Sequence, residues 1–450
     1  MNSLPLLLAI ILASILLIVV ATNRFKIHPF LALLIGALFV GFSVGMPSLA
    51  IIDSITAGFG SILAGIGLIV VLGTVMGVFV EKSGALGVIA DHIVRFLGSR
   101  HLHLSVALLG AVVSIPVFCD SGFIIMSRLV KRISKNEGIP SAPLSLSLGA
   151  GLYTTHTLVP PTPGPIAVAG NLSLSDQIGM IVITGLLVSI PVLLVSSIFS
   201  KKLGRDFVIE DNTEVIEEDS DGKRMSLIWA ITPVVLPILL ITLASVVKLF
   251  DIEGGINSTI IFLGNPFVAL LIGSILSMIQ VRPNATLDEM GDLFKHGINQ
   301  AGPIILITGA GGAFGSVLKG TPLADLLSGY LGEALTSFPI LIVLAFLFAA
   351  LLKTAQGSST SALVIGSAII APLLVNADSV STFQMSLLVM AFGGGAMTVS
   401  HANDSYFWVI TQFSGFSVKQ GYRGFSLLTL TQGLTTLLTV LVLYFISTLF

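Results

Sequence analysis

Long apolar runs separated by short polar or charged segments recur along the whole chain. Several of these runs exceed the roughly 20 residues that a helix needs to cross a hydrocarbon core of about 30 Å. The pattern predicts an all-α polytopic membrane protein with five spanning helices in each half. The expected spans lie near 4–22, 28–46, 61–80, 144–171 and 176–199 in the first half, and near 227–249, 262–281, 298–318, 384–412 and 425–448 in the second.

The two halves share a repeat. Residues 29–36 read PFLALLIG and residues 266–273 read PFVALLIG, at an offset of 237 positions. Because five crossings are an odd number, the second copy should be inverted relative to the first. Inverted repeats are typical of secondary transporters, whose site lies between the copies. The same offset pairs Gly60 with Gly297, Ala64 with Ala301, Gly65 with Gly302, Lys82 with Lys319 and Leu86 with Leu323.

Each half also contains an apolar stretch that polar residues interrupt in the middle. The first covers 103–134 and breaks at CDSG, and the second covers 337–374 and breaks at QGSSTS. Arms of about 13–17 residues are short for spanning helices and predict re-entrant hairpins. We therefore expect a first inverted repeat over 1–200, an acidic cytoplasmic linker over 201–225 and a second inverted repeat over 226–450.

Composition agrees with a membrane protein. Apolar residues make up 54% of the 450, charged residues make up 10%, and the mean hydropathy is +1.03. These values exclude an ordinary soluble domain. The single cysteine, Cys119, excludes an intrachain disulfide and a multi-cysteine metal site. We expect the lipid bilayer as surroundings and no cofactor, metal or nucleic-acid partner.

Charge placement predicts the orientation. With both termini outside, 18 of the 21 Lys and Arg residues fall on the inner side. The exceptions are Lys248 and Lys319, on the outer side, and Lys353, inside the second hairpin. This bias is what the positive-inside rule demands.

Five ionisable residues fall deep inside the predicted membrane segments, namely Asp120, His156, Lys353, His401 and Asp404. A charge at the bilayer centre costs about 2.5–3.5 kcal/mol on insertion scales, so such residues are candidates for function. They occur in four motifs, FCDSG, THTLVPPTPGP, KTAQGSSTS and SHAND.

Two of these motifs interrupt helices. Pro160, Pro161 and Pro163 remove backbone donors and forbid a continuous first helix. In the second copy Gly394, within a run of three glycines, should weaken the helix. Hairpin tips and broken helices should meet at mid-depth, where freed amides favour an anion.

The resulting pocket holds one cation, amide donors and many hydroxyls, which suits a small hydroxylated carboxylate. The candidate substrate-binding residues are Asp120, Ser121, Gly122, Thr155, His156, Thr157, Lys353, Gly357, Ser358, Ser359, Thr360, Ser400, His401 and Asn403.

Simpler readings remain open. Lys353 can be the counter-ion of Asp120 or Asp404, the two aspartates can cap half-helices, and His156 and His401 can serve helix packing. The glycine-rich segment 309–315, GAGGAFG, resembles a phosphate loop but lacks the Lys-Ser/Thr ending. Close helix packing is the better interpretation of that segment.

The chain resembles the gluconate permease (GntP) family of bacterial proton symporters. The resemblance rests on HPFLALL, FCDSGF, THTLVPPTPGP, GAGGAF, GSSTSALVIGSAIIAPL and SHANDSYFW, in the family's order. It implies uptake of gluconate or a related hydroxy acid across the bacterial cytoplasmic (inner) membrane. It also implies the ion-transporter superfamily, with inverted repeats, two hairpins, a homodimer and elevator-type movement.

The chain departs from the family pattern in its motifs. Thr162 stands where the family usually has His, Cys119 and Asp120 stand for an aromatic residue and Glu, and Lys353 replaces a frequent Arg. These departures leave glycerate, another aldonate or a D-hydroxy amino acid such as D-serine open beside gluconate.

The mechanism expected is proton-coupled import, with Asp120, His156, His401 or Asp404 as the proton carrier. Hydroxyl-rich tips leave sodium coupling open. An intramembrane aspartyl protease is disfavoured, because neither a GxGD nor a YD motif surrounds the deep aspartates. A passive anion channel is a distant alternative, because broken helices and hairpins favour a carrier over a pore or an enzyme.

Overall fold

The computed structural model describes residues 4–97, 101–207, 209, 225–249, 255–322, 337–371, 374 and 380–449. Every regular element in these ranges is a helix. Most of the predicted linker at 201–225 lies outside the described residues, as does Leu323 of the repeat.

The first half contains α1 (Leu4–Asn23), α2 (Pro29–Ser43), α3 (Ser48–Ile62), α4 (Leu68–Lys82), α5 (Ala85–Leu97), α6 (Leu102–Val113), α7 (Cys119–Glu137), α8 (Ser141–Leu158), α9 (Pro163–Asn171) and α10 (Ile178–Gly204). The second half contains α11 (Leu227–Leu249), α12 (Gly255–Leu263), α13 (Pro266–Val281), α14 (Leu287–Lys319), α16 (Phe338–Gln356), α17 (Ser359–Ile370), α18 (Thr382–Met397), α19 (Ser405–Ser414), α20 (Val418–Gly421) and α21 (Leu427–Ser447).

The repeated segments begin their helices in the same way. Both α2 and α13 start at a proline, where the missing N–H costs no helical hydrogen bond. The preceding side chain caps each helix: His28 accepts from Phe30 N at 3.3 Å, and Asn265 accepts from Phe267 N at 3.0 Å. Shared bounds and caps support the duplication, while the inversion of the second copy stays a prediction.

The third span of each half is longer than predicted. A π-helical segment joins α3 to α4, so that one helix runs over Ser48–Lys82 instead of 61–80. Its counterpart α14 starts at Leu287 instead of near 298, behind a capping box of Thr286 and Glu289. That box satisfies two of the orphan amides at the helix start, which explains the early beginning.

Eight helices of the described chain are long and apolar enough to cross a membrane. α2 and the pieces α9, α18 and α19 of the two interrupted helices are too short to be among them, and α8 is long enough but too polar. The hairpin arms also differ from expectation, since α7 and α16 each have 19 residues rather than 13–17. Within each hairpin a long helix pairs with one of 12 residues, α6 or α17.

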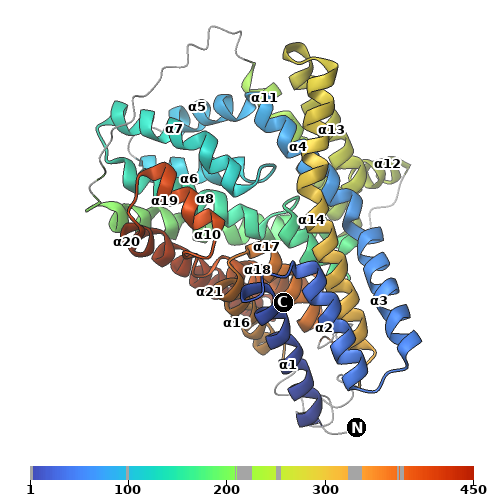
Figure 1. Cartoon of the computed structure of the whole chain (residues 1–450). Coiled ribbons are helices and arrows are strands. Elements are labelled where there is room, and N and C mark those ends of the chain that lie inside the picture. Colours follow the sequence, from blue (N-terminus) through green and yellow to red (C-terminus); the bar gives the residue numbers. More distant parts are fainter. Residues whose placement is uncertain are drawn as a thin grey trace.

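The helices form two groups that each draw on both halves of the sequence. In the first group α14 packs on α2, α3 and α4, and α13 packs on α4 and α11. In the second group α8 packs on α6, α7 and α10, while α18 packs on α16 and α21. Figure 1 shows the long helices α3, α13 and α14 beside the second group. Contacts of α14 with α17 and of α10 with α11 join the two.

The glycine-rich segment 309–315 lies at one of these joints. A Cβ on Gly312 would meet Ile62 of α3 at 2.2 Å, and one on Gly311 would meet Val364 of α17 at 2.8 Å. The segment therefore packs α14 closely against both groups, which confirms the packing interpretation.

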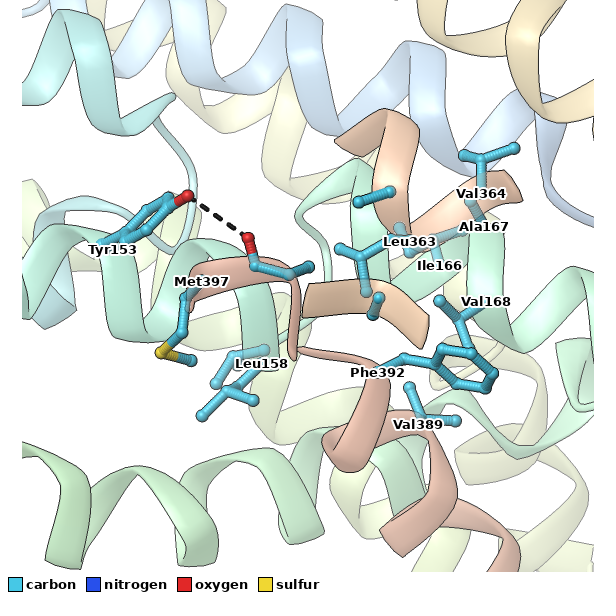
Figure 2. Packing of buried hydrophobic residues seen from close by; sticks show 14 of the residues in the cluster. Tyr153, Leu158, Ile166, Ala167, Val168, Leu363, Val364, Val389, Phe392 and Met397 are labelled. Atoms are coloured by element: carbon cyan, nitrogen blue, oxygen red, sulfur yellow. Dashed lines mark hydrogen bonds between the residues drawn. The ribbon is translucent and has the colours of Figure 1, made fainter. Parts of the chain in front are cut away.

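A buried apolar core surrounds the broken helices. Figure 2 shows Leu158 of α8 and Ile166 of α9 near Leu363 of α17 and Phe392 of α18, all of them at most 1% exposed. Asn171 adds polar contacts, because its amide donates to Val364 O at 3.0 Å and to Ser367 Oγ at 2.8 Å. α9, the helix that follows the first break, is thus held against the second hairpin.

Candidate functional site

The tip of the second hairpin is a tight turn between α16 and α17. Gly357 ends α16 in the left-handed region at φ 81°, which glycine adopts without strain. Ser358 caps α17 and accepts from Ser361 N at 3.2 Å. A Cβ on Gly357 would lie 2.1 Å from Asn403 O, so the tip touches the chain just before α19.

That chain segment is the break between α18 and α19. Asp404 caps α19 by accepting from Tyr406 N at 3.1 Å. Ser400 donates its hydroxyl to Asp404 Oδ2, and its amide donates to Thr429 Oγ1 of α21 at 3.0 Å. The broken segment is therefore an ordered loop with its carboxylate pointing inward.

Lys353 joins the tip to the break. Its Nζ donates to Asp404 Oδ2 at 2.6 Å and to Gly357 O at 2.6 Å, and the side chain is 1% exposed. The Tyr153 ring of α8 lies 5.7 Å from Nζ, within cation–π range. Of the readings left open by the sequence, Lys353 is the counter-ion of Asp404 in this structure.

His401 and Asn403 bind the same carbonyl. His401 Nε2 lies 3.0 Å from Thr354 O, and Asn403 Nδ2 donates to that oxygen at 2.8 Å. Thr354 belongs to the last turn of α16, whose carbonyls lack helical partners. These two side chains therefore fasten the break to the hairpin.

Asp120 lies on the first hairpin, in the first turn of α7. Asp404, Lys353 and Ser405 all lie close enough to interact with its carboxylate. Oδ2 lies 3.8 Å from Cys119 Sγ, and Oδ1 is a buried oxygen without a hydrogen-bond partner among the described residues. The two hairpin tips and the second helix break thus bring two carboxylates and one ammonium together.

The two residues that follow Asp120 in the motif differ in burial. Ser121 is half-buried in the same turn of α7. Gly122 is buried, and a Cβ there would meet the Leu152 side chain at 2.7 Å. Gly122 therefore permits close packing of α7 on α8.

The last turn of α8 is wholly buried. Thr155 Oγ1 donates to Ala111 O of α6 at 2.7 Å, and Thr157 Oγ1 donates to Tyr153 O at 3.1 Å. Both hydroxyls are thus bound to backbone carbonyls. His156 lies within electrostatic range of Asp404 and Lys353, and its Nδ1 has no partner in the described chain.

The two helix breaks have different causes. The first spans 159–162, between α8 and α9, and Pro160, Pro161 and Pro163 lie in it or directly after it. The second does not start at the glycines, because α18 continues through Gly394 to Met397. A Cβ on Gly394 would meet Thr436 of α21 at 2.7 Å, so this glycine is needed for packing and its predicted helix-breaking role is corrected.

Comparison with known proteins identifies the family of this chain. The GntP family permease profile matches residues 6–446. The chain belongs to the GntP permease family. It is 31% identical over 443 residues to a gluconate permease of Pseudomonas aeruginosa, covering 97% of this chain and 95% of the relative. It is 31% identical over 445 residues to the D-serine transporter DsdX of Escherichia coli K12, covering 97% and 98%.

A solved structure shares the fold of this GntP permease. The YdaH transporter of Alcanivorax borkumensis superposes with a TM-score of 0.63 at 16% identity, covering 87% of this chain and 86% of that one. Family, relatives and fold together identify a multi-pass membrane protein of a transporter family.

Sequence reasoning missed several residues of this GntP permease site. Gln356, directly before Gly357, has a buried amide whose oxygen and nitrogen both lack partners among the described residues. It lies in the polar break of the second hairpin, but the sequence does not show that its amide is buried without partners. Tyr153 was missed because a tyrosine in an apolar helix resembles core, and Ser405 because it follows the last charged residue of its motif.

Proposed function

We propose that this chain is a secondary active transporter that imports a small hydroxylated carboxylate, such as gluconate, together with a proton across the bacterial inner membrane. The observation that carries the proposal is the buried Lys353–Asp404 pair, held where a hairpin tip meets a broken helix. Charged groups in such a position mark substrate or ion pathways. The names of the two relatives support the substrate class, because gluconate and D-serine each carry a carboxylate and at least one hydroxyl group.

The substrate carboxylate is assigned to the N-terminus of α17. The first-turn residues Ser359 and Thr360 offer their amides there, beside the exposed cap Ser358. A helix N-terminus favours an anion through its unpaired amides and its dipole. Lys353, one turn before the tip, is neutralised by Asp404, so the helix amides and not a free cation hold the anion.

The substrate hydroxyls are assigned to the amides around the same tip. Gln356 carries an amide oxygen and nitrogen without hydrogen-bond partners among the described residues, and these match the donor and acceptor of a hydroxyl. Asn403 is exposed beside the tip and uses one amide proton on Thr354 O, so its oxygen is open to a donor. This pattern selects a polyol chain over an apolar one.

Transport requires that the site open to each side in turn. We assign the movement to the second helix group, which holds both hairpin tips, sliding past the first group in an elevator-type step. A homodimer contact through the first group would keep that group still. Both termini are placed outside, as the charge bias demands.

Uptake into vesicles tests this function. Purified protein is reconstituted, and accumulation of labelled gluconate is followed under an inward proton gradient, with an inward sodium gradient as the comparison. Saturable uphill accumulation driven by protons alone is expected, with inhibition by unlabelled aldonates. Accumulation driven only by sodium contradicts the proton coupling, and uptake that never exceeds equilibrium contradicts a coupled carrier and favours a channel.

A further inference from the structure

We propose that Asp120, and not Asp404 or either deep histidine, carries the coupled proton. The inference rests on the proposed proton-coupled import and assigns the coupling to one carboxylate. It follows from comparing what each of the four candidates already binds.

Both carboxylate oxygens of Asp404 already accept hydrogen bonds. Its Oδ2 accepts from Lys353 and from Ser400, and its Oδ1 accepts from Tyr406 N to cap α19. The side chain is 6% exposed. Protonation would leave a buried ammonium without its counter-ion and weaken a helix cap. Asp404 is therefore the fixed partner of Lys353.

The two histidines are also poor carriers. His401 Nε2 lies 3.0 Å from the Thr354 carbonyl, so its ring already fastens the second break to the hairpin. His156 lies 5.9 Å from the Phe118 ring, between ring centroids, and within electrostatic range of both Asp404 and Lys353. A second cation there would be buried without an acceptor at Nδ1, so the charged ring is not supported.

Asp120 differs from Asp404 because one of its oxygens has no hydrogen-bond partner among the described residues, and from His156 because it is less deeply buried. Oδ1 is buried and unpartnered within the described chain, yet the residue itself is half-buried rather than sealed. Its carboxylate meets the weak donor Cys119 Sγ, 3.8 Å from Oδ2, and the hydroxyl of Ser405, but no cation is bound to it as Lys353 is bound to Asp404. A proton on this carboxyl turns an orphaned acceptor into a donor without breaking any contact that Asp404 makes.

Groups from every helix around Asp120 define its setting. From α16 and α19 it faces Lys353 and Asp404, with Ser405 beside it, and Cys119 precedes it on α7. The buried phenols of Tyr153 on α8 and Tyr406 on α19 also lie within electrostatic range. Since Lys353 is already matched by Asp404, Asp120 is the surplus negative charge of the cluster.

This charge balance gives the coupling its physical basis. With Asp120 ionised the cluster is net negative and repels a substrate carboxylate. One proton on Asp120 makes the cluster neutral, and the protonated carboxyl can donate a hydrogen bond to the anion or one of its hydroxyls. Proton and substrate therefore bind together and leave together.

The test compares Asp120→Asn with wild type in vesicles, using labelled gluconate and two assays. Asp120→Asn should lose uphill accumulation under a proton gradient but keep gluconate exchange, with an exchange rate that no longer depends on pH. Asp176→Asn, the same change at an exposed position between α9 and α10, is the matched control and should keep both activities. Uphill accumulation by Asp120→Asn overturns the proposal.

Two further measurements decide the remaining cases. If Asp120→Asn does not exchange, calorimetric titration of gluconate in buffers of different ionisation enthalpy measures proton uptake on binding. Binding without proton uptake supports the proposal, whereas binding with proton uptake, or no binding, overturns it.

If the Asp120→Asn variant does not fold, Asp120→Glu is tested instead. Asp120→Glu should keep uphill accumulation with a shifted pH profile, and an unchanged profile overturns the proposal. If the wild-type protein does not accumulate gluconate under a proton gradient, the proposed function itself is contradicted.

Discussion

Lys353 and Asp404 form a buried ion pair across 51 residues of sequence, with Nζ 2.6 Å from Oδ2. The pair links the tip of the second hairpin to the start of α19. Each partner has a second task, since Lys353 holds the Gly357 carbonyl and Asp404 caps α19. The geometry of the site therefore depends on both.

Breaking this pair from one side should be costly. Lys353→Met and Asp404→Asn should each destabilise the protein by about 3–5 kcal/mol, because each leaves an uncompensated buried group. The double variant should cost less than the sum of the two single variants. Unfolding in detergent measures the differences.

An exposed pair is the matched control for that experiment. Lys295 and Asp292 on α14 lie 3.0 Å apart with side chains 76% and 74% exposed. Lys295→Met should therefore change stability by only about 0–1 kcal/mol. Equal effects of Lys295→Met and Lys353→Met would contradict a structural role for the buried pair.

Gly357→Ala should damage the site beyond its backbone strain. A Cβ in the left-handed region costs roughly 1–2 kcal/mol, and here it would also lie 2.1 Å from Asn403 O. Gly45 has nearly the same φ, 80° against 81°, but its Cβ would meet nothing within 4 Å. Gluconate uptake should be lost in Gly357→Ala and kept in Gly45→Ala. Similar uptake in the two variants would mean that tip and break need no close contact.

Gln356 should discriminate among substrates. Gln356→Leu should weaken gluconate binding by about 1–3 kcal/mol, the cost of leaving polar groups unpaired. Gln356→Glu should weaken it further, because a carboxylate repels the anion. Thr354→Val, at an exposed side chain of the same turn, is the control and should bind as wild type does. Unchanged affinity and selectivity in Gln356→Leu would remove this residue from the site.

A disulfide between the two helix groups should stop transport. A Cβ on Gly65, between α3 and α4, would lie 3.5 Å from the Cβ of Ser175, which precedes α10. That separation suits a disulfide. In a Cys119→Ser background, oxidised Gly65→Cys/Ser175→Cys should not take up gluconate, and reduction should restore uptake. Full uptake by the oxidised protein would contradict sliding of one group past the other.

The sequence predicted those features that depend on local chemistry. Pro29 and Pro266 mark repeated helix starts, and Pro160 and Pro161 mark the first break, because proline acts on its own backbone. The four motifs FCDSG, THTLVPPTPGP, KTAQGSSTS and SHAND correctly marked the segments that meet at the site. The early start of α3 was missed, because Asp53 and Thr56 interrupt its apolar pattern although the helix continues through them.

The rest of the site depended on distances that a sequence does not contain. The choice between Asp120 and Asp404 as counter-ion of Lys353 required the contact between the end of α16 and the residue that caps α19. A glycine such as Gly394 is expected both where a helix breaks and where two helices cross closely. Only the close approach of Thr436 shows that Gly394 serves a helix crossing. Gln356 became a candidate only when its amide proved buried without partners.

The most direct test of the central claim is accumulation of labelled gluconate in vesicles that contain only this protein, at a fixed inward proton gradient. The account predicts uphill, saturable accumulation that collapses when a protonophore dissipates the gradient. It also predicts inhibition by other small hydroxy acids. Absence of accumulation for gluconate, glycerate and D-serine alike, with the protein folded and correctly inserted, would contradict it.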